Sequence, residues 1–152
     1  LGQLAGQTFK AQAADGDRVE LKLDLGSVTV GMDQAISAGL LVNELITNCL
    51  KHGFPDGRRG VVSLALQPAP AGSAATEPTV FANVWRLCLS DDGVGLPADF
   101  EHRRQKSLGQ QLVSDLTQQI GGTLNVHSQP GAGAEFAIDF RVVEPAPLVM
   151  PQ

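Results

Sequence analysis

The order of hydrophobic and polar residues along the chain predicts five strands. Apolar and polar residues alternate strictly in RVELKLDL (18–25) and in EFAIDFRV (135–142), as they do in strands with one buried face. Three further runs are also expected to be strands: VVSLALQ (61–67), VFANVWRLCLS (80–90) and TLNVHS (123–128). The last of these and 135–142 face each other across QPGAGA, which predicts a closing hairpin.

Helical spacing of apolar residues predicts two helices. The first runs from about Asp33 to His52, and its apolar arc consists of Leu41, Val42, Leu45, Ile46, Cys49 and Leu50. The second runs from Leu108 to Ile120 and is expected to end at the glycine pair that follows. Ser107 is placed to cap its N-terminus, and Gln110 stands at the spacing of a capping box.

This order of elements predicts an α+β fold, a mixed and mostly antiparallel sheet with helices layered on one face. The other face of the sheet is then exposed or meets another domain. One domain is expected over residues 1–145, followed by a frayed C-terminal tail over 146–152. The Pro/Ala-rich segment 68–79 is expected to be a disordered excursion without function.

Composition narrows the class of protein. The 152 residues are 43% hydrophobic and 18% charged, which is ordinary for a soluble globular domain. The net charge is −5 and the basic residues are scattered along the sequence, so no basic segment indicates nucleic-acid binding. The cysteines, Cys49 and Cys88, are expected to be reduced core residues. No apolar run approaches the roughly 20 residues of a membrane span, and the initial Leu1 suggests a piece of a longer protein.

The polar residues of the first helix are unusual for a solvated face. Four of them are mediocre helix formers, at positions where Glu, Lys, Arg or Gln would be better: Asn43, Thr47, Asn48 and His52. One stripe covers about a quarter of the helix circumference and consists of Glu44, Asn48, Lys51 and His52. A carboxamide can ligate Mg²⁺, and a cation can meet phosphate oxygens. The alternative is the solvated face of an ordinary amphipathic helix.

Two further segments carry candidate chemistry. DDGVGLP (91–97) follows a strand, and its glycines let the backbone approach a flat ligand while Asp91 offers an acceptor for an amine. SLGQQLV (107–113) begins a helix, whose free amide groups favour phosphate. A tight Asp-Gly turn and a simple capped helix start are the respective alternatives.

Taken in order, these segments resemble the ATP-binding domain shared by gyrase, heat-shock chaperones, histidine kinases and MutL, the GHKL superfamily with its Bergerat fold, an α/β sandwich. NELITNCLKH is similar to the N box, DDGVGLP to the G1 box, SLGQQLV to the G2 box, and GAGAEF to the terminal G-x-G-T-x-F. The resemblance covers residues 18–142. It is closest to bacterial sensor histidine kinases with a short lid, on three features: Lys51-His52, Phe54-Pro55 and Ser107-Leu108-Gly109.

The resemblance implies roles for the residues around the phosphates. Asn48 would ligate Mg²⁺, and Glu44 would orient the attacking group or accept its proton. Lys51 would contact a phosphate, and His52 would line the pocket near the nucleotide. The amides at the second helix start would hold the β- and γ-phosphates, at Ser107, Leu108 and Gly109.

At the other end of the nucleotide, Asp91 would hydrogen-bond the adenine amino group, with Gly93 and Gly95 shaping the adenine floor and the lid hinge. Two positions depart from the pattern, since Ser107 replaces the first G2 glycine and Ala134 replaces a threonine. The lid, roughly 97–107, is short.

The implied function is the ATP-binding catalytic domain of a two-component sensor histidine kinase, with ATP and Mg²⁺ as cofactors. The acceptor would be a histidine on a separate helical dimerisation domain, because no histidine of this chain stands in an H-box context. A response regulator would act downstream, the location would be cytoplasmic although the parent protein could be associated with a membrane, and the fragment would be monomeric. The alternatives are an anti-sigma-factor serine kinase and a degenerate adaptor that no longer binds ATP.

Overall fold

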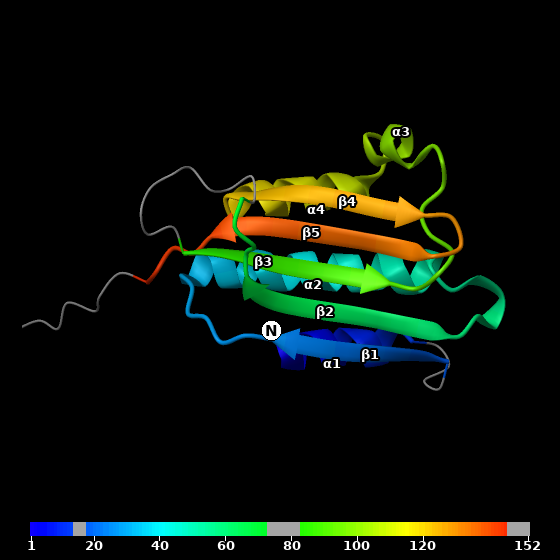
Figure 1. Ribbon diagram of the computed structural model, residues 1–152, viewed down its shortest axis with the longest axis horizontal. Helices are drawn as coiled ribbons and strands as arrows, with labels where there is room; N and C mark the ends of the chain where they lie inside the picture. Colours follow the sequence, from blue (N-terminus) through cyan, green and yellow to red (C-terminus); the bar gives the residue numbers. More distant parts are fainter. Residues whose placement is uncertain (14–17, 73–82, 146–152) are drawn as a thin grey trace, which may run out of the picture.

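A single five-stranded sheet forms the base of the molecule in the computed structural model, which describes residues 1–13, 18–72 and 83–145 (Figure 1). The strand order is β1-β2-β3-β5-β4, where β1 pairs with β2 in parallel and the other neighbours are antiparallel. The strands are β1 (Val19–Leu25), β2 (Gly60–Pro68), β3 (Val84–Asp91), β4 (Gly122–Gln129) and β5 (Gly133–Arg141).

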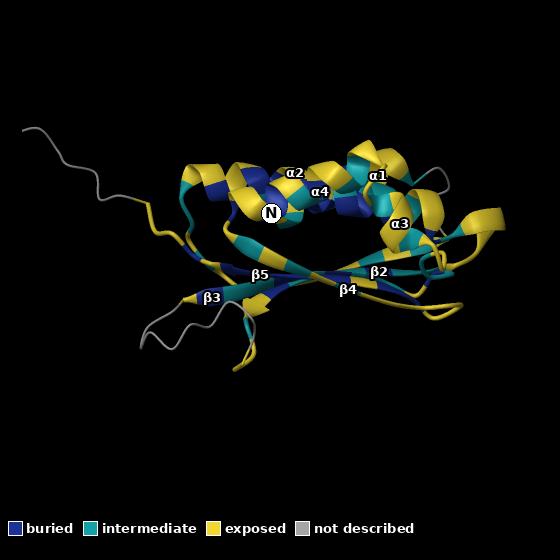
Figure 2. Ribbon diagram, turned by 90° about the horizontal axis from the view of Figure 1, so that it is seen from above, coloured by how far each residue is buried: buried dark blue, intermediate teal, exposed yellow. Residues whose placement is uncertain are grey.

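Helices cover one face of this sheet (Figure 2). The covering layer consists of α1 (Gly2–Gln12), α2 (Met32–His52) and α4 (Leu108–Gln119). Two short elements lie in connections, a 3₁₀ turn η1 (Pro55–Gly57) and α3 (Phe100–Arg104). The predicted α+β fold is therefore confirmed, with a mixed and mostly antiparallel sheet under one layer of helices.

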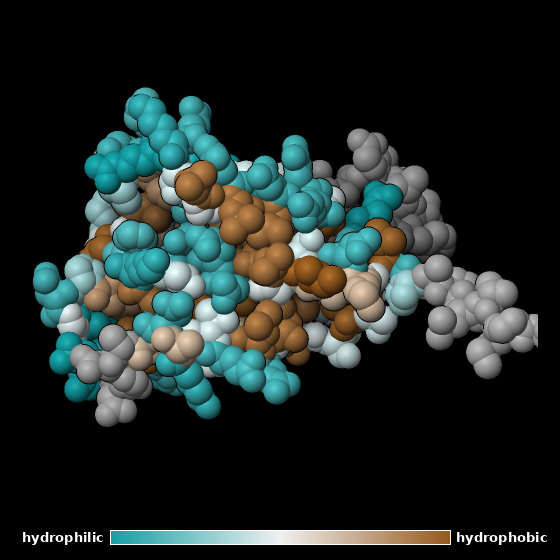
Figure 3. Space-filling model, turned by 180° about the vertical axis from the view of Figure 1, so that it is seen from behind, coloured by the Kyte–Doolittle hydropathy of each residue, from teal (hydrophilic) through white to brown (hydrophobic). Residues whose placement is uncertain are grey.

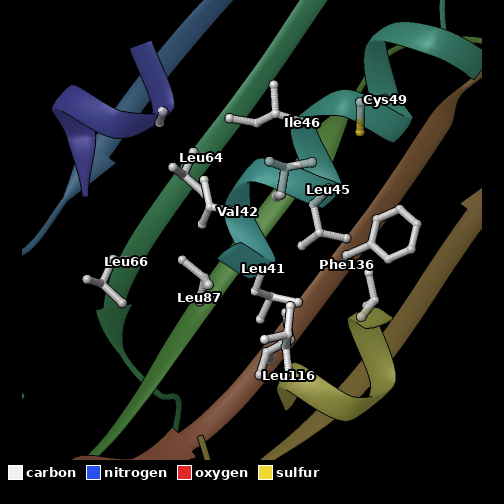
Figure 4. Packing of buried hydrophobic residues seen from close by; sticks show 14 of the residues in the cluster. Leu41, Val42, Leu45, Ile46, Cys49, Leu64, Leu66, Leu87, Leu116 and Phe136 are labelled. Atoms are coloured by element: carbon white, nitrogen blue, oxygen red, sulfur yellow. The ribbon is translucent and has the colours of Figure 1, made fainter. Parts of the chain in front are cut away.

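The core lies between α2 and the central strands (Figure 4). The apolar arc of α2 faces inward-pointing residues of the sheet, and Leu41, Leu45 and Ile46 are completely or almost completely buried. On the sheet side, Leu64, Leu89 and Phe136 stand opposite one another across β2, β3 and β5. This packing fixes both the rotation of α2 and its position along the strands, and therefore decides where its polar stripe lies.

The N-terminal helix α1 is not predicted by the sequence pattern. It contains two glycines, Gly2 and Gly6, and its first turn has no side-chain cap, so its intrinsic helix propensity is low. Packing supplies the missing stability, because Ala5 and Phe9 are buried in the core. The helix also covers the edge strand β1, where Gly2 lies against Leu25.

Most predicted boundaries agree with the structure to within a few residues. The predicted strand 80–90 begins only at Val84, and its first three positions lie outside the described residues. Most of the Pro/Ala-rich segment 68–79 and all of the predicted tail 146–152 also lie outside them.

The outer face of the helical layer carries exposed hydrophobic residues (Figure 3). Met32, Ile36 and Leu40 follow one another at four-residue spacing along α2, and each is more than half exposed. None of the helices that the structure describes combines the length and the apolar character that a membrane crossing requires.

The opposite face of the sheet is mostly polar. One row crosses all five strands and consists of Lys22, Ser63, Ser90, Glu135 and His127. On the same face Asp139 is only 1% exposed, and Arg86 binds it through two hydrogen bonds, from Nε to Oδ1 at 2.6 Å and from Nη2 to Oδ2 at 2.7 Å. Both cysteines are free; Cys49 is buried in the core and Cys88 is partly buried.

Removing Arg86 is expected to destabilise the fold, because the Asp139 carboxylate then stays buried without a partner. We expect Arg86→Met to lower the free energy of unfolding by about 2–3 kcal/mol, somewhat less than for a fully buried pair since Arg86 reaches water. The double variant Arg86→Met/Asp139→Leu should regain most of this loss. Urea denaturation measures both. Arg103→Met, which breaks an exposed pair, is the control, and an equal loss in the control would contradict the prediction.

Cys88 is expected to react slowly with alkylating reagents. Burial, followed by the charge of Glu135, raises the pKa of this thiol from 9.0 to about 11. Since the thiolate is the nucleophile, alkylation at pH 8 should be about tenfold slower than for an unshifted thiol, after allowing for the greater nucleophilicity of a more basic thiolate. The rate should then rise about tenfold for each pH unit up to about pH 10 and level off above the pKa of about 11. Peptide mass spectrometry after iodoacetamide pulses measures it, and a plateau by pH 9 would contradict the shift.

Candidate functional site

A cavity of about 570 Å³ opens between the C-terminal half of α2, the end of β3 and the start of α4. This volume is typical of a small-molecule site. Among the predicted site residues, five line the cavity: Asn48, His52, Asp91, Gly95 and Ser107. Segments that are far apart in the sequence therefore meet here, as the order of motifs predicts.

The α2 side of the cavity is formed by Asn48 and His52. The Asn48 Nδ2 atom is buried and has no hydrogen-bond partner among the residues that the structure describes. A buried polar atom without a partner is costly unless a ligand or water satisfies it. Lys51 is exposed and does not line the cavity.

Asn43, one of the four unusual polar residues of α2, does not line the cavity. Its Oδ1 accepts a hydrogen bond from the Thr8 hydroxyl at 2.9 Å, which ties α1 to α2. The sequence could not reveal this role, because α1 itself is not predicted. A ligand-facing role is therefore supported for Asn48 and His52 but not for Asn43.

Asp91 is the last residue of β3 and lies on the face of the sheet that is covered by the helices. Leu87, Leu89 and Asp91 alternate along β3, and the two leucines are buried under the helices. The Asp91 carboxylate accepts a hydrogen bond from the Gly93 backbone N–H to Oδ1 at 2.8 Å. It accepts a second from the Cys49 thiol to Oδ2 at 3.3 Å. Burial and the nearby Asp91 charge raise the pKa of Cys49 well above its ordinary value.

Close backbone approaches around Asp91 require glycine. A Cβ on Gly93 would lie 2.8 Å from Asp91 Oδ1 and would collide with the carbonyl of Gly53. Gly95 has a φ of +79°, and a Cβ there would lie 2.5 Å from the carbonyl oxygen of Gln129. The loop after β3 is thus pressed against both the end of α2 and the β4–β5 turn.

The start of α4 presents free backbone amides. Ser107 is the N-cap residue, but its side chain makes no capping hydrogen bond, so the predicted capping box does not form. The Gln110 Oε1 atom, which the capping box would have used, is instead buried without a partner, and both side chains line the cavity. Leu108 is 83% exposed and does not line the cavity.

Gly109 lies directly against Glu44. A Cβ on Gly109 would be only 2.5 Å from Glu44 Oε1. This contact brings the predicted carboxylate to the same helix start as the predicted glycine, although neither lines the cavity.

Several residues that line the cavity are not among the predicted site residues, including Cys49, Phe100, Arg103 and Arg104. Phe100 packs edge-on against Phe136, with 6.3 Å between ring centroids. Arg103 bonds Asp99 at 2.6 Å, and Arg104 lies 3.6 Å from Glu101. The charged run EHRR is visible in the sequence, but only the fold shows that residues of α3 line the cavity.

The cavity lining combines two kinds of polar group. The Asp91 carboxylate, whose two oxygens each accept one hydrogen bond from the protein, can accept another from an amine. A carboxamide, the start of a 12-residue helix and two arginines, each paired with a carboxylate, favour phosphate. A ligand that carries both an amine and an anionic group fits this lining.

Comparisons with known proteins agree with this geometry. Residues 33–144 match the family described as histidine kinase-, DNA gyrase B-, and HSP90-like ATPase. The chain is 30% identical over 149 residues to "Blue-light-activated histidine kinase 2" of Erythrobacter litoralis, which covers 98% of this chain and 39% of that protein. It is 26% identical over 108 residues to "Sensor histidine kinase PdtaS" of Mycolicibacterium smegmatis, covering 70% of this chain and 19% of the relative.

A solved structure is similar over nearly the whole chain. The histidine kinase domain of the Erythrobacter litoralis EL346 blue-light-activated histidine kinase superposes with a TM-score of 0.77 at 30% identity, covering 93% of this chain and 58% of that one. The chain thus spans about two fifths or less of the curated relatives' length.

Replacing Gln110 by leucine is expected to stabilise the ligand-free protein. Its buried Oε1 has no partner, and leucine is similar in size and helix propensity, so the free energy of unfolding should rise by about 1 kcal/mol. Thermal or urea denaturation measures the change. Gln118→Leu, at an exposed position of the same helix, should change stability by less than about 0.5 kcal/mol. A destabilised Gln110→Leu protein would show that the oxygen is satisfied in solution.

Proposed function

Because the chain belongs to the histidine kinase-, DNA gyrase B-, and HSP90-like ATPase family, we propose that it is the ATP-binding catalytic domain of a sensor histidine kinase. In this proposal it positions Mg·ATP so that the γ-phosphoryl group is transferred to a histidine on a separate helical dimerisation domain. The names of the relatives, all histidine kinases, favour this function over an anti-sigma-factor kinase or a degenerate adaptor.

One observation carries the proposal: the buried, unpartnered amide of Asn48 and the carboxylate of Asp91 line the same cavity. A decayed site would not be expected to retain an unsatisfied buried amide, because its cost would no longer be offset by ligand binding. The degenerate adaptor is therefore the weaker alternative.

At the base end, Asp91 accepts a hydrogen bond from the adenine amino group. The Gly93 N–H holds Oδ1, so the carboxylate is oriented before the ligand arrives. Gly93 and Gly95 shape the adenine floor, because without side chains they let the loop backbone lie directly against Gly53 and Gln129. Phe100 and Phe136 supply the apolar wall beside it.

At the phosphate end, Asn48 is the residue that fits a Mg²⁺ ligand, since a carboxamide oxygen binds this ion while the Nδ2 group can donate to a phosphate oxygen. When bound, Mg²⁺ neutralises charge on the phosphates. The amides of Leu108 and Gly109 donate to the β- and γ-phosphates, whereas the Ser107 N–H already donates to the Arg103 carbonyl at 3.0 Å and is not free to do so. Arg103 and Arg104 on α3 add positive charge at the same end.

Three side chains of α2 complete the proposed phosphate end. Glu44, held against Gly109, orients the attacking imidazole or accepts its proton. His52 lines the cavity near the nucleotide, and the exposed Lys51 reaches a phosphate. Phosphoryl transfer needs little more from the protein than such positioning and charge stabilisation.

The phosphoacceptor is proposed to lie on another domain of the parent protein. Of the three histidines, His52 belongs to the cavity, while His102 and His127 are exposed on α3 and β4. A response regulator would receive the phosphoryl group next. The use of ATP and the two free thiols support a cytoplasmic location. We expect the 152-residue chain to be monomeric and not to bind nucleic acid, given its net charge of −5.

Calorimetric titration with the Mg²⁺ complex of a non-hydrolysable ATP analogue tests the proposal. We expect micromolar-to-millimolar binding by the wild type, and Asn48→Ala and Asp91→Ala should each weaken it by at least about tenfold, because each removes a metal or charge-assisted contact. Asn43→Ala is the matched control, since Asn43 lies on the same helix but bonds Thr8 outside the cavity.

Either of two results would contradict the proposed function. The first is absence of binding by a folded wild-type protein. The second is an equal loss in Asn43→Ala and Asn48→Ala, which would mean that α2 responds to any polar substitution rather than through the cavity.

A further inference from the structure

Two hydrogen bonds from the protein hold the Asp91 carboxylate, one on each oxygen. Its Oδ1 accepts the Gly93 N–H at 2.8 Å. Its Oδ2 accepts the Cys49 thiol at 3.3 Å. Since a carboxylate has about four acceptor directions, roughly two remain free, and Asp91 lines the cavity.

Of these two hydrogen bonds, only the one from Cys49 is made by a side chain. The Gly93 N–H is fixed by the chain path, because the next residue, Val94, donates its N–H to the Gly53 carbonyl at 2.9 Å. It holds Oδ1 in place, but on its own it leaves the carboxylate free to turn about this oxygen. The thiol at Oδ2 supplies the second point that stops this rotation.

Cys49 is itself rigidly placed. It continues the buried face of α2 after Leu41 and Leu45, at four-residue spacing, and only 4% of it is exposed (Figure 4). Its sulfur therefore stands at the boundary between the core and the cavity. An ionised carboxylate has no proton to give, so the thiol is the donor and Asp91 the acceptor.

We propose that Cys49 is a positioning residue for base selectivity: it locks the Asp91 carboxylate so that only a base with an amino group can face it. This inference rests on the proposed function. A locked carboxylate presents lone pairs to the ligand and cannot turn away, so a 6-oxo purine would place its carbonyl oxygen against them. An unlocked carboxylate can rotate or take up water between the two, which weakens the preference for the amine.

A thiol that merely fills space in the core makes a different prediction. In that case any residue of similar volume serves, and valine replaces cysteine better than serine does. In our proposal the donor matters, and serine replaces cysteine better than valine does, because the serine hydroxyl can still donate to Asp91.

The test is titration of Mg·ATP and Mg·ITP, which differ at the 6-position of the purine, into five forms of the 152-residue chain. These are wild type, Cys49→Ala, Cys49→Val, Cys49→Ser and the control Cys88→Ala, whose thiol lies on the opposite face of the sheet. The readout is the ratio of the two dissociation constants within each form. This ratio does not depend on the fraction of folded protein, so partial unfolding of a core variant cannot imitate the effect.

We expect the preference for ATP over ITP to fall about fivefold in Cys49→Ala and Cys49→Val, the equivalent of one modest hydrogen bond. The fall should come mainly from weaker ATP binding. Cys49→Ser and Cys88→Ala should keep the wild-type ratio within about twofold.

The possible failures are distinguishable. If the wild type binds neither nucleotide, the proposed function is contradicted and this inference falls with it. If the wild type prefers ATP but Cys49→Ala and Cys49→Val keep its ratio, the inference about Cys49 alone is overturned. The same holds if Cys49→Ser loses the preference as fully as Cys49→Val does.

Discussion

The close approach of the C-terminal end of α2 to the sheet is the constraint on which the rest of the site depends. Leu41 and Leu45 fix α2 over the central strands, and the next residue on that face, Cys49, already meets Asp91. Where α2 ends, Gly53 and Gly93 allow the backbone of the helix end to touch the loop after β3. A side chain at either glycine would separate the two elements and, with them, the two halves of the cavity.

The faces of α2 and β3 that form the core therefore also carry residues of the cavity. Along β3 the inward-facing positions are Leu87, Leu89 and then Asp91, so the row that builds the core ends in the acceptor. The cavity also contains costs that packing alone would remove, since the amide groups of Asn48 and Gln110 each bury an atom without a partner. A loss of folding stability at such positions is typical of ligand-binding sites.

The sequence was informative about the fold because strand alternation and the apolar arc of α2 follow directly from burial on one face. It failed for α1, whose glycines hide a helix that only packing of Ala5 and Phe9 stabilises. It also did not reveal the surroundings of Asn43 and Gln110. Local spacing predicts a ligand face and a capping box, whereas Thr8 satisfies Asn43 and the cavity surrounds Gln110.

By itself, the sequence determined which residue types are available and in what order: a polar stripe on a helix, Asp-x-Gly-x-Gly after a strand, and a glycine in the first turn of a second helix. Only the tertiary structure decided which of them meet. Cys49 reaches Asp91 across 42 residues, and Glu44 meets Gly109, because the strand order places β3 beneath α2 and the start of α4 beside it. Contacts between distant segments depend on helix rotation and strand register, which the packing of the whole core sets and no local pattern encodes.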